Sequence, residues 1–200
     1  MKNRTHVAVG AAAALAAVQP QTALGCAVAV AAGALGAAVS DVDLLWKKSA
    51  REVFHKVLGA ALAMVCLVAL DVLARADVTT QLTALVGKDW PWGLGLLLGL
   101  CVCGFFSDHR SFTHSLLGMT LFTVAVHLLV PGHALGFLSG FASHLALDLL
   151  NRKPLRLLFP FRGGFSLRIC SADGLVNSLL LWAGWLLTAA YVGGVLMAHV

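Results

Sequence analysis

Charged residues are scarce in this 200-residue chain, since Asp, Glu, Lys and Arg together make up only 12% of it. A soluble domain carries about 25%, so the scarcity excludes an ordinary soluble globule, a disordered chain and a nucleic-acid-binding tail. Apolar residues reach 60%, and the mean hydropathy is +0.89. A helix needs ~20 apolar residues to cross a bilayer, so the chain has room for about six or seven spans. We therefore predict an all-α polytopic membrane protein with a single domain over residues 1–200.

Cysteine is also sparse, with five residues in the chain. Four of them lie within apolar runs, their number is odd and no C-x-x-C pair occurs, so the sequence does not indicate a disulfide framework. We interpret the cysteines as small buried hydrophobic residues.

Seven apolar segments account for most of the chain. They cover residues 7–18, 23–39, 57–73, 92–106, 116–130, 134–150 and 175–195. Lys2 and Arg4 precede the first segment, as they would in a signal peptide. A second long apolar segment follows without a polar mature domain, however, so we predict an uncleaved helical hairpin.

Positive charge is distributed unevenly around these segments. With the N-terminus in the cytoplasm and seven alternating spans, twelve of the 14 Lys and Arg residues lie on the cytoplasmic side. Only Arg75 and Lys88 lie on the other side. Because cytoplasmic loops of membrane proteins are enriched in Lys and Arg, we predict a multi-pass protein with a cytoplasmic N-terminus.

Polar residues at membrane depth are costly, and four polar clusters interrupt the apolar sequence. The clusters are Thr5-His6, Ser40-Asp41-Val42-Asp43, the segment 108–115, and Ser143-His144 with Asp148. All four fall at the cytoplasmic ends of predicted helices, although that topology follows from basic residues alone. We therefore expect them to form a single site.

The spacing within these clusters favours metal binding. His144 and Asp148 are four residues apart, so a helix places both on one face. Asp41 and Asp43 follow a predicted helix, where an extended chain turns alternate side chains the same way. Imidazoles and carboxylates are the ligands of Zn²⁺ and related divalent ions, and two ions bridged by carboxylates suit phosphoester hydrolysis. The predicted metal ligands are His6, Asp43, His114, His144 and Asp148.

The order of these motifs resembles the YdjM-like family of inner-membrane, LexA-regulated metal-dependent hydrolases. The resemblance covers about residues 1–165. The elements that carry it are Thr5-His6, Asp41-Val42-Asp43, His109-Arg110-Ser111-Phe112-Thr113-His114-Ser115, Gly140-Phe141-Ala142-Ser143-His144-Leu145-Ala146-Leu147-Asp148 and Phe159-Pro160. It implies an all-helical inner-membrane protein with a divalent-metal site formed by these residues. It also implies a remote similarity to zinc-dependent phospholipase C and P1-type nucleases.

The sequence departs from the family pattern at three positions. Ser40 stands where the family usually has proline, Leu44 stands where some members have histidine, and Asn151 replaces a common threonine. An extra helical hairpin is also predicted at about residues 53–106, between the second and third clusters. Two added spans preserve the sidedness of the predicted site.

We therefore predict a membrane-bound hydrolase that cleaves a phosphoester, either a small molecule or a lipid, with a metal-activated water. The metal is predicted to be Zn²⁺, with Mn²⁺ as the alternative, at one or two ions per chain. Asp41 is the expected base or bridging carboxylate, while His109 and Arg110 orient the site or neutralise leaving-group charge. Membrane lipids are the expected partners and nucleic acid is not; the sequence leaves the oligomeric state open.

The alternative is a non-enzymatic membrane protein, or an ion or proton transporter that uses the same His and Asp residues. A transporter places its polar groups near the bilayer midplane. Here the polar clusters lie at predicted helix ends, which favours a site that opens to the surface.

A basic stretch follows the last cluster and mixes arginine with Leu and Phe over residues 152–168. It is explained either by contact with anionic headgroups or by recognition of a substrate phosphate. In the second case Arg110, Arg152 or Arg156 would form the bidentate contact that a guanidinium makes with phosphate.

Overall fold

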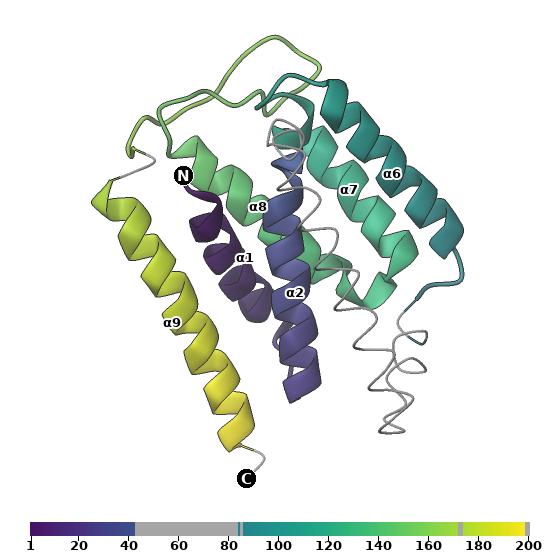
Figure 1. Cartoon of the computed structure of the whole chain (residues 1–200), viewed down its shortest axis with the longest axis vertical. Helices are drawn as coiled ribbons and strands as arrows, with labels where there is room; N and C mark the ends of the chain where they lie inside the picture. Colours follow the sequence, from purple (N-terminus) through teal and green to yellow (C-terminus); the bar gives the residue numbers. More distant parts are fainter. Residues whose placement is uncertain (43–83, 85, 172–173, 199–200) are drawn as a thin grey trace, which may run out of the picture.

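The computed structural model describes residues 1–42, 84, 86–171 and 174–198. The predicted span 57–73 and the predicted ligand Asp43 lie outside these residues. The described part is helical, which confirms the all-α prediction (Figure 1). Its elements are α1 (Asn3–Val18), α2 (Ala23–Val39), α6 (Trp90–Phe106), the 3-10 helix η1 (Phe112–His114), α7 (Leu116–Leu129), the 3-10 helix η2 (Pro131–His133), α8 (Ala134–Leu149) and α9 (Leu175–Met197).

Among these helices, α9 is the one long and apolar enough to cross a membrane by length and composition. It has 23 residues, few of which are buried. The apolar helices α2 and α6 have 17 residues each and α7 has 14, whereas membrane-spanning helices have about 20 residues within a range of about 17–25.

Glycine allows three helices to approach one another closely. A methyl group on Gly33 of α2 would overlap the carbonyl oxygen of Gly10 in α1. One on Gly140 of α8 would overlap the carbonyl of Gly33. Small residues at such crossings are typical of packed membrane helices. The close approach holds the ends of α1, α2 and α8 that carry the polar clusters next to one another.

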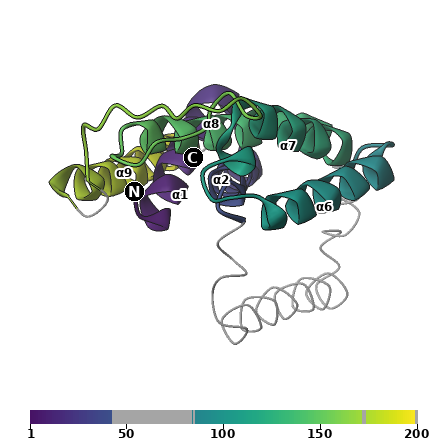
Figure 2. The ribbon, with the colours of Figure 1, turned by 90° about the horizontal axis from the view of Figure 1, so that it is seen from above.

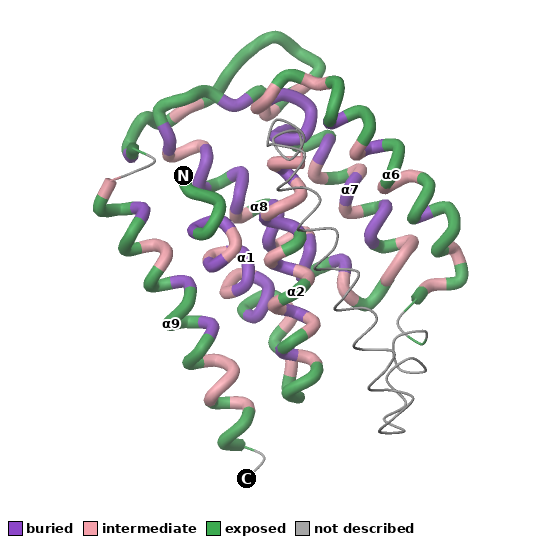
Figure 3. Tube along the Cα trace, viewed as in Figure 1, coloured by how far each residue is buried: buried purple, intermediate pink, exposed green. Residues whose placement is uncertain are grey.

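Apart from α9, which packs against α1 at one edge, the helices form two rows when seen from above (Figure 2). One row contains α7 and α8, whose facing sides bury Phe122, Phe137 and Phe141. The other contains α1, α2 and α6. Buried residues concentrate in α1, α8 and the inner side of α7, whereas α6 and α9 are largely exposed (Figure 3).

Residues 151–170, which we call the basic hairpin, connect α8 towards α9 across one end of the bundle (Figure 1). Leu155 and Phe165 exchange two backbone hydrogen bonds of 2.8 Å each. Leu167 N–H also donates to the carbonyl of Leu149 at 2.8 Å. The basic hairpin therefore has a defined backbone and lies directly over the end of α8.

Candidate metal centre

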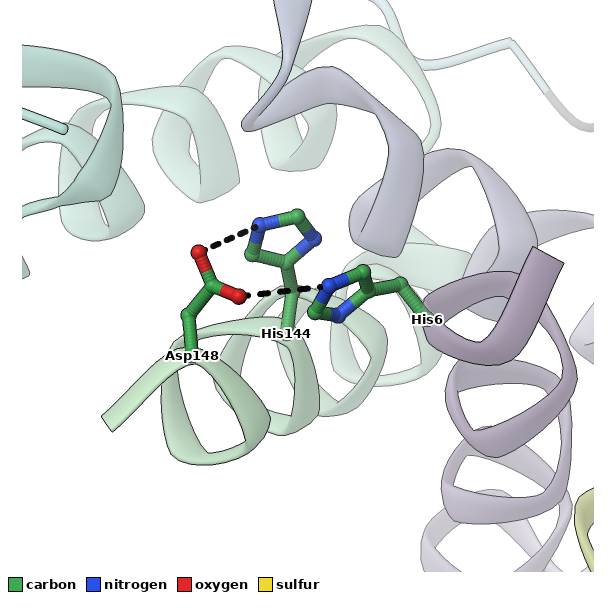
Figure 4. Close-up of side chains that lie close together, drawn as sticks. All are labelled: His6, His144 and Asp148. Carbon is green, nitrogen blue, oxygen red and sulfur yellow. Dashed lines mark ion pairs between the residues drawn. The ribbon is translucent and has the colours of Figure 1, made fainter. Parts of the chain in front are cut away.

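Two imidazoles and a carboxylate lie buried where α1 meets the last turns of α8 (Figure 4). His6 Nε2 is 3.3 Å from Asp148 Oδ1, and His144 Nε2 is 4.0 Å from Asp148 Oδ2. The rings of His6 and His144 stack with their centroids 3.9 Å apart. One ligand atom from each of the three residues lies within 4.8 Å of the others, so the group is compact enough to hold a metal ion.

A second group lies beside the first and consists of Asp41, His109 and His114. Their ligand atoms also lie within 4.8 Å of one another. His114 Nε2 is 3.4 Å from Asp41 Oδ1, and the rings of His109 and His114 are 5.0 Å apart at their centroids. His114 is fully buried, whereas Asp41 and His109 are half-buried. The second group therefore forms the outer part of the site.

The two groups meet at a pair of imidazole nitrogens. Nε2 of His114 is 3.3 Å from Nε2 of His144. Asp148 Oδ2 lies 3.8 Å from the former nitrogen, and Asp41 Oδ1 lies 3.9 Å from the latter. The donors thus surround a common space, and their number suits one or two ions.

The surroundings of the two rings favour a cation in this space. Nδ1 of His144 is 2.7 Å from the carbonyl oxygen of Ala37. Because a carbonyl only accepts, Nδ1 carries the hydrogen and Nε2 of the neutral ring carries a lone pair. Nδ1 of His114 is 3.1 Å from the Thr113 hydroxyl, which can accept a hydrogen bond from Nδ1 and so leave a lone pair on Nε2.

A histidine whose other nitrogen donates to a backbone carbonyl is the usual arrangement at protein metal sites. Within the described residues, the buried Nδ1 of His6 has no hydrogen-bond partner, so its ring can present either nitrogen. The residues of the site therefore fit a divalent ion.

The Asp41 carboxyl lies just beyond the end of α2. Burial raises its pKa, while the hydrogen bond from His114 and the nearby imidazoles of His144 and His6 lower it. The pKa of Asp41 ends below its ordinary value, so this group is a carboxylate at neutral pH.

Arg110 ties the site to the basic hairpin. Its Nη2 is 2.9 Å from Asp148 Oδ2, and its Nη1 donates to the carbonyl of Lys153 at 2.7 Å. The residue has a φ of 67°, a left-handed conformation that is uncommon for a side-chain-bearing residue. Arg110 thus orients the Asp148 carboxylate and partly compensates its charge.

Asn177 at the start of α9 is a buried polar residue whose contact with α1 the sequence pattern does not predict. Its Oδ1 accepts hydrogen bonds from the Thr5 hydroxyl at 2.9 Å and from Lys2 N–H at 3.1 Å. These bonds fix the first turn of α1 and therefore the position of His6. The available signal was a lone amide side chain in an otherwise apolar segment.

The structure brings seven of the eight predicted site residues together at one end of the bundle, and the eighth, Asp43, lies outside the described residues. The seven are His6, Asp41, His109, Arg110, His114, His144 and Asp148. They come from α1, the end of α2, the segment around η1, and α8.

Comparison with known proteins places the chain among membrane proteins. Residues 1–200 match the family model described as YdjM inner membrane protein. The chain is also similar to the uncharacterized protein YvsG of Bacillus subtilis (strain 168), with 32% identity over 108 residues. The match covers 53% of this chain and 64% of YvsG, which is less than two thirds of that relative. No solved structure matches the chain.

Proposed function

Since the chain belongs to the YdjM inner membrane protein family, we propose that it is a multi-pass, metal-dependent hydrolase that cleaves a phosphoester. One observation carries the proposal. The ring of His144 is fixed by the Ala37 carbonyl so that its Nε2 lone pair points at His114 and towards two carboxylates. Arg110 compensates Asp148 only in part, so a cation bound between these nitrogens and carboxylates would offset the cost of burying them.

The proposed ligands divide into an inner and an outer set. His6, His144 and Asp148 form the buried inner set, and His114 stands between it and the outer residue Asp41. Mixed imidazole and carboxylate donors fit Zn²⁺ or Mn²⁺, whereas Ca²⁺ takes oxygen ligands. Asp43 remains a proposed ligand from its position in the D-x-D motif alone.

When bound, a divalent ion supplies Lewis-acid polarisation of a phosphoryl oxygen and lowers the pKa of water at the site. The half-buried Asp41 carboxylate is placed to accept a proton from a nucleophile at the outer edge of the cluster. His109 lies against His114 on the same side, where it can orient a substrate. Arg110 holds Asp148 through its ion pair rather than pointing away from the cluster.

The proposed orientation puts the N-terminus and the site at the cytoplasmic side of the inner membrane. The distribution of Lys and Arg residues supports it, because the cluster lies at the end that carries the basic hairpin. A phosphoester in or near the cytoplasmic leaflet is the proposed substrate, and membrane lipids are the proposed surroundings. A proton or ion pathway would need polar groups near mid-span.

Metal analysis of detergent-purified protein tests the first part of the proposal. We expect wild type to retain zinc or manganese after dialysis, and His144→Ala and Asp148→Asn to lose it. His127→Ala is the matched control, because His127 is an exposed histidine in the last turn of α7. Equal metal content in wild type and both site variants would overturn the metal assignment.

Hydrolysis assays test the second part. Wild type is incubated with aryl phosphomonoesters, phosphodiesters and phospholipids in mixed micelles, with and without added Zn²⁺ or Mn²⁺. We expect metal-dependent turnover of at least one class and none in His144→Ala. A protein that holds metal tightly but cleaves nothing would instead have a metal-stabilised structural or transport role.

A further inference from the structure

We infer that the basic hairpin, residues 151–170, is a docking surface for anionic phospholipid headgroups next to the proposed site. The inference rests on the proposed membrane location. It does not depend on metal binding or hydrolysis.

The basic hairpin presents charge of a single sign. It contains five Lys and Arg residues, all exposed, and no Asp or Glu. Nη1 of Arg156 lies 4.0 Å from Oδ2 of the exposed Asp108. In the described part of the chain, Arg152, Arg162 and Arg168 have no ion-pair partner, so their charges are available to an anionic surface.

Large apolar side chains alternate with these charges and also face outward. Phe161 is 76% exposed, Ile169 68% and Leu167 61%. Exposed aromatic and aliphatic side chains interleaved with arginine are typical of segments that lie in the headgroup layer. Leu155 and Cys170 point inward and are buried, so the two faces of the hairpin differ in their surroundings.

The backbone of the hairpin is held in place before any lipid binds. The paired hydrogen bonds between Leu155 and Phe165 close it, and the Ser166 hydroxyl donates to the carbonyl of Asn151 at 2.5 Å. Cys170 N–H donates to the carbonyl of Leu150 at 2.9 Å. Little ordering is therefore needed for the exposed side chains to contact a membrane.

Arg110 connects this surface to the candidate metal centre. Arg156 N–H donates to the Arg110 carbonyl at 3.1 Å, and the Arg110 guanidinium bridges the Lys153 carbonyl and the Asp148 carboxylate. Headgroups bound by the hairpin therefore lie beside the residues proposed to act on a phosphoester.

Limited proteolysis in nanodiscs tests the proposal. The full chain is reconstituted in phosphatidylcholine alone or in phosphatidylcholine with phosphatidylglycerol, and tryptic cleavage after Arg162 and Arg168 is followed by mass spectrometry. We expect cleavage to be several-fold slower in the anionic discs and the difference to vanish in 1 M salt, where the Debye length is about 3 Å. Cleavage after Lys88, which is exposed just before α6, serves as the internal control.

A matched pair of variants separates lipid contact from charge attraction of the protease. Phe161→Ser is expected to restore cleavage in anionic discs. Leu24→Ser, at a residue 62% exposed near the start of α2, is expected to leave the protection unchanged.

Equal cleavage rates in the two lipid compositions would overturn the proposal. Slow cleavage after Arg162 and Arg168 in both discs, unaffected by salt, would also overturn it. In that case a protein segment or a second copy of the chain, rather than anionic lipid, would cover the hairpin. The readout needs no bound metal, so it remains valid if the proposed hydrolase activity is not found.

Discussion

The two carboxylates of the cluster occupy different surroundings at the residue scale. The Asp148 side chain is 4% exposed and lies between His6 and Arg110. The Asp41 side chain is 17% exposed and meets His114 at the outer edge. A buried carboxylate facing imidazole nitrogens is suited to hold a metal, and a more accessible, ionised one is suited to proton transfer.

We therefore expect Asp148→Asn and Asp41→Asn to fail in different ways. Asp148→Asn should lower metal affinity by more than about tenfold. Asp41→Asn should keep the metal while turnover falls by about 10²- to 10⁴-fold. Metal content after dialysis against a chelator and hydrolysis rates measure the two effects.

Asp108→Asn is the control for both variants, because the Asp108 side chain is 85% exposed. This substitution should change neither the metal content nor the hydrolysis rate. Equal loss of metal in the Asp41 and Asp148 variants would contradict the division of roles.

Arg110 compensates the buried charge of Asp148 in the same way that a bound cation would. Removing one partner of a buried ion pair typically costs about 3–5 kcal/mol. Arg110→Gln should therefore destabilise the metal-free protein more than the metal-loaded protein. The measurement is Tm in detergent with and without added Zn²⁺, and we expect a larger zinc-induced rise in the variant than in wild type.

Arg156→Gln provides the comparison, because the side chains of Arg156 and Asp108 are 50% and 85% exposed and exposed pairs contribute little to stability. If zinc raises the Tm of Arg110→Gln and of wild type by the same amount, Arg110 does not compensate the charge of Asp148.

At the element scale, the crossing of α1, α2 and α8 depends on glycine. Gly33→Ala would place a methyl group against the Gly10 carbonyl and the Ala14 side chain. Overpacking of this kind typically costs about 1–3 kcal/mol. We expect a lower Tm and a reduced metal content, because the same crossing holds His6 beside His144.

Gly95→Ala makes the same chemical change in α6, where a methyl group would contact nothing within 4 Å. It should leave Tm unchanged or raise it, since alanine favours a helix over glycine by about 0.5–1 kcal/mol. A similar fall in Tm for both variants would point to a general effect of losing glycine.

Hydropathy predicted the elements well where apolar residues alone define them. The predicted segments 23–39 and 175–195 correspond to α2 and α9. Segment 7–18 was predicted too short, because α1 begins at Asn3. Its first turn carries polar residues that hydropathy excludes, yet Thr5 and His6 are buried against α9 and α8 by long-range contacts.

The candidate site was predictable from side-chain chemistry but not from backbone contacts. Periodicity placed His144 and Asp148 on one face, and charge distribution placed the polar clusters at one end. The carbonyl of Ala37, which fixes the His144 ring, and the left-handed backbone of Arg110 carry no residue-type signal. Both depend on how α2 and the η1 segment pack against α8.

At the scale of the whole molecule, the site joins segments that are far apart in the sequence. His6 and Asp148 meet because the start of α1 lies beside the end of α8, under the basic hairpin (Figure 1). The C-terminal end of α9 lies at the other end of the bundle (Figure 1). The two ends of the described chain are therefore on opposite sides if α9 crosses the membrane perpendicular to its plane.

This arrangement predicts opposite locations for fusions at the two termini. Positive charge should hold the end with the site, which includes Lys2, Arg4 and the basic hairpin, in the cytoplasm. Green fluorescent protein, which folds in the cytoplasm, should fluoresce when fused to the N-terminus and stay dark after residue 198. Alkaline phosphatase, which needs the periplasm, should be active only at the second position. Fluorescence at both positions would place the two ends on one side and contradict both the charge argument and a spanning α9.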